Sequence, residues 1–285
     1  MEGVDTTTAL VVMYWLALSL VGIGILVRMA YQRKTSIPKP DMPAWNAGWT
    51  EFLVFLVMVY VISILAVGTV ASITMEWEDT ELQVWETPLI ALTFQCILLV
   101  GAVAGFHPKF HFMNFSLSPA RSAVPRSMLI GLYWFLASVP IVFAATIIWI
   151  PFLTFLNELG FPVSIERQSI VDEFASMDSI GAMIALVIAA VVLAPLSEEI
   201  LFRGIIYRFL KGKMAQNGAV LVSAAMFAFL HLNLLSVVPL FVLGVLLAKS
   251  YESEQNILVP IFFHGFYNAN SIFLIIMMPE MPESL

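Results

Sequence analysis

Long apolar runs constrain this chain more than any other feature of its sequence. Most are about 18 to 28 residues long, close to the roughly 20 residues that a helix needs to cross hydrocarbon. With 60% hydrophobic and 12% charged residues, the sequence predicts an all-α, polytopic transmembrane helical bundle of about eight spans. The runs are 8–27, 52–74, 88–106, 128–155, 180–197, 216–234 and 257–278, with a shorter run, typical of a tilted or partial span, at 236–248.

The basic residues predict how these spans are oriented. When the loops between spans are numbered alternately, every Lys and Arg except Arg167 falls on one side. Membrane proteins retain these residues in their cytoplasmic loops. We therefore expect a multi-pass protein of the cell membrane with both termini outside the cytoplasm. The net charge of −7 comes from acidic loops on the opposite side and gives no support for nucleic-acid binding.

Ionisable residues at membrane depth are few and lie in the last third of the chain, together with two asparagines. A charged side chain in hydrocarbon costs about 2.5 to 3.5 kcal/mol on insertion scales, so such residues normally face the bundle interior or a water-filled cavity. We therefore expect a functional core at 176–285, preceded by transmembrane spans of unassigned role at 1–175. The polar residues are Glu198, Glu199, Arg203, His231, His264, Asn268 and Asn270.

Distances along the helices place several of these groups in one layer. Glu198 and His231 each lie about 15 residues from the turn at 212–218, which is roughly 22 Å at 1.5 Å per residue. Asn268 lies roughly 18 Å beyond the next turn, and His264 is one helical turn shallower. Three helices can therefore deliver a carboxylate, two imidazoles and an amide to one site.

Residues four apart on a helix share a face, and this spacing predicts two further contacts. Glu199 and Arg203 can form an ion pair, while Glu198, about 100° away around the helix, stays free to act. The ring of Phe227 lies one turn below His231 and is suited to wall a pocket against lipid. A purely structural interpretation is an ion pair and interhelical hydrogen bonds that only hold helices together.

These residues also form three motifs that resemble a known family. The segments "EEILFRG" at 198–204, "FAFLH" at 227–231 and "HGFYN" at 264–268 are similar to the EExxxR, FxxxH and HxxxN motifs of the CPBP family. That family includes type II CAAX prenyl endopeptidases and bacteriocin-processing or Abi-like, immunity-associated relatives. The likeness covers about residues 180–275. It implies an intramembrane endopeptidase with a water-filled cavity and a peptide or protein substrate, prenylated or unprenylated, in membrane lipid.

The resemblance also implies roles for individual residues. Glu198 and His231 would activate a water, and His264 and Asn268 would bind the oxyanion. Glu199 and its arginine would hold the catalytic helix. The implied enzyme is a glutamate-type peptidase without a cofactor.

Two alternatives stay open at the level of sequence. Two histidines and a glutamate form an accepted catalytic zinc set, and Glu198, His231 and His264 could supply it. No HExxH pairing is present, however, and Asn268 would have no role as a ligand. The other alternative is a transporter or scaffold in which the same polar cluster binds or relays a proton. Such carriers often contain inverted repeats, and the sequence shows none.

Overall fold

The structure, a computed structural model, is a bundle of helices, which confirms the predicted fold class. It describes residues 6–35, 42–45, 47–74, 83–105, 123–163, 177 and 179–277. Within these ranges the regular elements are all helical. In chain order they are α1 (Thr6–Thr35), α2 (Trp49–Thr74), α4 (Glu86–Gly105), α5 (Ala123–Glu158), α7 (Ile180–Ile188), η2 (Ala189–Leu193), α8 (Ala194–Glu199), η3 (Ile200–Tyr207), α9 (Arg208–Lys211), α10 (Gln216–Phe229), α11 (Val237–Glu254) and α12 (Leu258–Met277).

Six helical segments in the described residues are long and apolar enough to cross a membrane. Large apolar side chains remain exposed on them, such as Leu20 of α1 and Ile148 of α5, as expected for surfaces that contact lipid. Of the eight predicted spans, the sixth and seventh correspond to α10 and α11, which do not meet these criteria. α10 has 14 residues, or about 21 Å, and is shorter than the roughly 30 Å of hydrocarbon.

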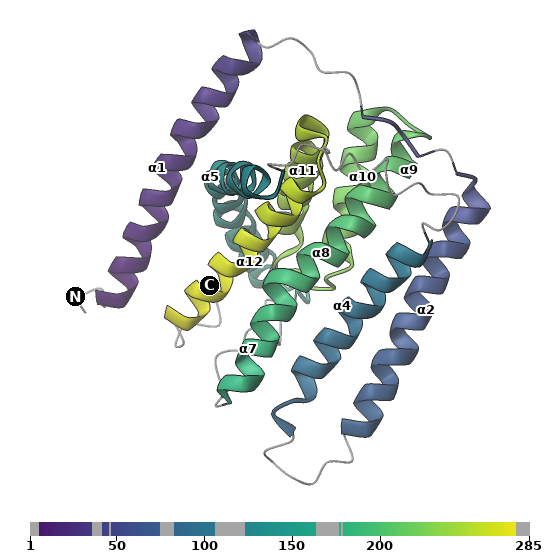
Figure 1. Cartoon of the computed structure of the whole chain (residues 1–285). Helices are drawn as coiled ribbons and strands as arrows, with labels where there is room; N and C mark the ends of the chain where they lie inside the picture. The colour runs from purple at the N-terminus through teal and green to yellow at the C-terminus, as the bar shows by residue number, and fades with distance from the viewer. Residues whose placement is uncertain are drawn as a thin grey trace.

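The N-terminal end of α1 and the C-terminal end of α12 lie on the same side of the bundle (Figure 1). This arrangement agrees with a multi-pass protein whose chain crosses the membrane an even number of times. Which side faces the cytoplasm stays a prediction. Four of the basic residues used for it, Lys39, Lys109, Arg121 and Arg167, lie outside the described residues.

The helices from the second half of the chain are flanked by helices from the first half. α5 packs against both α11 and α12, α1 packs against α5, and α2 packs against α4. α4 in turn packs along the segment from α7 to η3 (Figure 1). At the crossing of α5 and α12, a Cβ on Gly131 would come within 2.7 Å of the Phe262 Cβ. Only glycine permits this approach, as is common where membrane helices pack closely.

One long helical rod from Ile180 to Lys211 carries the two glutamates of the first motif. The predicted span ended at residue 197, so the structure extends it by more than three turns. Two π-helical stretches, η2 and η3, flank α8, which ends at Glu199. Such widened turns are uncommon and often occur at functional sites.

Candidate active site

The two adjacent glutamates of the rod have different surroundings. Glu199 is fully buried, whereas Glu198 is half-buried. Glu199 Oε1 accepts hydrogen bonds from Arg203 Nη1 at 2.8 Å and from His264 Nδ1 at 2.9 Å. The predicted pair between Glu199 and Arg203 is therefore present, and His264 is an additional partner that the sequence did not indicate. The paired carboxylate ties the rod to α12.

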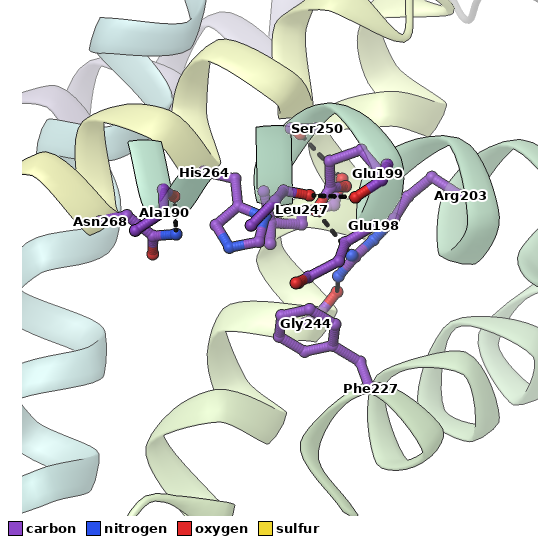
Figure 2. A network of polar contacts seen from close by, with 12 residues as sticks. Ala190, Glu198, Glu199, Arg203, Phe227, Gly244, Leu247, Ser250, His264 and Asn268 are labelled. Carbon is purple, nitrogen blue, oxygen red and sulfur yellow. Dashed lines mark hydrogen bonds and ion pairs between the residues drawn. The ribbon is translucent and has the colours of Figure 1, made fainter. Parts of the chain in front are cut away.

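Arg203 extends this contact to a third helix. Its Nη2 donates to the backbone oxygen of Gly244 in α11 at 3.1 Å (Figure 2). Its guanidinium carbon lies 4.7 Å from the centre of the Phe227 ring on α10, which is a cation–π distance. Arg203 is fully buried, and these contacts replace part of the water that a guanidinium loses on burial, since its Nε has no hydrogen-bond partner among the described residues. One side chain thus connects the rod with α10, α11 and, through Glu199, α12.

Glu198 faces a different neighbour because adjacent residues point about 100° apart around a helix. Its Oε1 accepts a hydrogen bond from Gln95 Nε2 at 3.2 Å. Gln95 belongs to α4, in the half of the chain to which the sequence analysis assigned no role. The signal that could have indicated it is an amide in the middle of an otherwise apolar span.

The sequence analysis placed His231 within a helix, and this prediction is wrong, because His231 lies just beyond the end of α10. α10 ends at Phe229, and Leu232 adopts a left-handed conformation with φ of 49°. The Nδ1 of His231 lies 2.8 Å from the Phe227 backbone oxygen. Because a carbonyl only accepts, this nitrogen carries the hydrogen, and Nε2 is left as the acceptor.

Phe227 brings the two imidazoles together. Its ring centre lies 4.9 Å from that of His231 and 5.7 Å from that of His264, both edge to face. The ring is fully buried and contacts both imidazoles. No hydrogen bond joins Glu198 to either imidazole among the described residues. The predicted cooperation of Glu198 and His231 therefore needs a water or substrate atom between them.

Asn268 binds a backbone group that the helix itself leaves without a partner. Its Nδ2 donates to the oxygen of Ala190 at 2.8 Å (Figure 2). In the π-helical turn the Ala194 amide bonds to Ala189, and the following residue, Pro195, has no amide hydrogen to offer. The Ala190 oxygen thus fixes the orientation of the Asn268 amide. The second hydrogen of that amide is available to another acceptor.

Gly265 allows α12 to approach the same π-helical turn. A Cβ at this position would lie 2.9 Å from the Val191 backbone oxygen, which is closer than van der Waals contact allows. His264 and Asn268 flank this glycine on α12. The close approach therefore sets the positions of both side chains relative to the rod.

The same geometry bears on the zinc alternative. Within the described ranges, no three His, Cys, Asp or Glu side chains are grouped so that they could hold a metal ion. Glu198, His231 and His264 therefore do not form a ligand set in this arrangement. The Nδ1 atoms of both histidines already contact protein oxygens, at Phe227 and Glu199.

The second half of the chain matches a family model. Residues 180–270 match the family described as Type II CAAX prenyl endopeptidase Rce1-like, and this range includes all three motifs. The resemblance to the CPBP family is confirmed. The chain is also similar to a Bacillus subtilis (strain 168) protein named "Putative membrane peptidase YdiL", with 33% identity over 106 residues. No solved structure matches the chain significantly.

The extent of these similarities is limited to one part of the molecule. The alignment with the Bacillus subtilis protein covers 37% of this chain and 42% of that protein. Gln95 and the helices α1 to α5 lie outside the residues matched by the family model. The site therefore combines residues from the CPBP-like segment, residues 180–270, with the side chain of Gln95 from α4.

Proposed function

We propose that this chain is an intramembrane endopeptidase that hydrolyses a peptide bond of a membrane-associated substrate, in the manner of the CPBP family. The observation that carries the proposal is the different environment of the two glutamates. Glu199 is saturated on one oxygen by Arg203 and His264, whereas Glu198 is half-buried and has only an amide partner. One carboxylate is thus structural, and its neighbour is left for chemistry.

In the proposed reaction Glu198 is the general base. Its carboxylate takes a proton from a water, and the water oxygen attacks the carbonyl carbon of the scissile peptide bond. His231 assists, because its Nε2 is an acceptor that can hold the same water. The proton then passes to the leaving amine when the carbon–nitrogen bond breaks. A positioned general base contributes about 10² to 10⁴-fold to such a rate.

His264 and Asn268 are the proposed oxyanion donors. With Nδ1–H directed to Glu199, the Nε2 of His264 is the nitrogen that can act on substrate, and it donates when the ring is protonated. Asn268 has a second amide hydrogen beyond the one bound to Ala190. Donors of this kind typically contribute about 10² to 10³-fold each.

The substrate class is proposed from the family similarity alone. The family model is named for CAAX prenyl endopeptidases, so a prenylated peptide with a C-terminal CAAX sequence is the first substrate to test. The same peptide without the prenyl group is the matched comparison. Cleavage of both at similar rates would assign the chain to a broader membrane peptidase activity.

The experiment uses the full chain purified in detergent and reconstituted in lipid vesicles with these two peptides. We expect turnover by the wild type, a loss of about 10²-fold or more in Glu198→Gln, and unchanged turnover in Glu158→Gln. Glu158 is an exposed glutamate at the end of α5 and serves as control. Turnover that persists with a chelator supports the route through Glu198, and turnover lost with a chelator contradicts it. No turnover of either peptide would favour a carrier or scaffold.

A further inference from the structure

The contact between α4 and the rod joins the unassigned half of the chain to the proposed base. Gln95 lies in the third turn of α4, near the middle of an apolar helix, where an amide is costly unless its hydrogen-bonding groups are satisfied. Both ends of this amide have partners on the rod. Its Nε2 donates to Glu198 Oε1 at 3.2 Å, and its Oε1 accepts from the Ser197 hydroxyl.

The two partners together fix which way the amide points. A carboxylate can only accept hydrogen bonds, so the NH2 group must face Glu198. The oxygen of the amide then faces Ser197, whose hydroxyl can donate. Ser197 is fully buried, and its one hydroxyl hydrogen is shared between the Gln95 Oε1 and the Leu193 oxygen, which lies 2.8 Å from Oγ. A flipped amide would direct its NH2 group to Ser197 and its oxygen to the Glu198 carboxylate.

We infer that Gln95 is a positioning residue that orients the Glu198 carboxylate for its role as base, an inference that rests on the proposed function. The amide holds one carboxylate oxygen from the α4 side, which leaves the other oxygen for the attacking water. Gln95 does not contact the reacting atoms, so it acts through Glu198. This gives α4, outside the CPBP-like segment, a defined part in the reaction.

The test compares variants of Gln95 with a neighbour on the same helix. Gln95→Met keeps the length of the side chain and removes both hydrogen-bonding groups. Gln95→Asn keeps an amide but shortens it by one carbon, so it cannot reach Ser197 and Glu198 together. Cys96→Ala changes an exposed side chain and is the control. Turnover is measured in vesicles as kcat and KM per folded molecule, with thermal unfolding measured alongside.

We expect both Gln95 variants to lower kcat by about 10- to 100-fold with KM within about twofold of the wild type, since small misplacements of a reacting group have effects of this size. A residue that only packs would leave kcat unchanged in Gln95→Met, and that result would overturn the inference. Should Gln95→Met fail to fold, Gln95→Asn decides the question by the same criterion.

A second comparison separates orientation from stability. Ser197→Ala removes the hydroxyl that orients the amide, and we expect a several-fold lower kcat. Combined with Gln95→Met, it should lower kcat no further than Gln95→Met alone, because Ser197 acts through Gln95. If the double variant lost kcat by the product of the two single losses, Ser197 would not act through Gln95. Absence of turnover in the wild type would refute the proposed function itself, whereas wild-type turnover with an unaffected Gln95→Met would refute only the role of Gln95.

Discussion

The buried ion pair offers the sharpest test of how this site is held together. The perturbation is Arg203→Met, which keeps an unbranched side chain and removes the charge. Glu199 then loses the 2.8 Å contact from Nη1, and the Gly244 oxygen loses its 3.1 Å contact from Nη2. His264 remains as the partner of the carboxylate. The variant therefore leaves a buried carboxylate with one donor where there were two.

The expected cost follows from these contacts. Removing one partner of a buried ion pair typically costs about 3 to 5 kcal/mol of unfolding free energy, because the remaining charge is uncompensated. The remaining His264 contact places the expected value near the lower end, at about 3 kcal/mol. The double variant Glu199→Gln with Arg203→Met has no buried charge at these two positions. It should recover at least about 1 kcal/mol relative to Arg203→Met alone.

The assay is reversible unfolding of the purified chain in detergent, followed by tryptophan fluorescence. Lys249→Met is the matched control, because Lys249 is exposed on α11 and its loss should change stability by no more than about 0.5 kcal/mol. A cost below about 1 kcal/mol for Arg203→Met, or a double variant as unstable as the sum of both single changes, would refute the reasoning.

Three further changes test the rest of the site. Gly265→Ala places a Cβ 2.9 Å from the Val191 oxygen, so α12 must move; we expect a loss of about 1 to 3 kcal/mol in unfolding free energy, and unchanged stability would contradict the close packing. Asn268→Ala removes the donor to Ala190 and a proposed oxyanion donor; turnover should fall about 10² to 10³-fold, and a fall below tenfold would argue against that role. Phe227→Ala removes a fully buried ring between two imidazoles and should cost about 3 to 5 kcal/mol by thermal unfolding, while a cost under 1 kcal/mol would show that the ring is dispensable.

Helical periodicity explains why part of the site could be predicted from the sequence. Glu199 and Arg203 are four residues apart, so their contact depends only on a regular helix, and the structure contains it. The ring contact between Phe227 and His231 has the same local origin. Apolar runs likewise marked where the helices lie, because hydrocarbon requires nearly every residue of a span to be apolar.

Contacts between helices could not be derived in this way. Sequence spacing does not tell which helix lies beside which, so the bonds of His264 to Glu199 and of Gln95 to Glu198 were not predicted. The end of α10 before His231 was also missed, since apolar residues continue through the turn that follows. The π-helical turn η2 contacts α12 at Gly265, and this approach is a feature of the assembled bundle that the sequence does not show.

The short length of α10 has a consequence for solvent at the site. α10 stops after 14 residues, so the chain turns before a helix of this length could cross the hydrocarbon. The peptide groups of that turn are therefore outside the helical hydrogen-bond pattern while still at membrane depth. Some of them have protein partners, such as the Leu234 oxygen, which accepts from the Trp149 indole at 2.9 Å. A peptide group of the turn without a protein partner needs water at this depth, and water that reaches the turn also reaches His231. The turn after the short helix α10 would then be the route by which the water for hydrolysis enters.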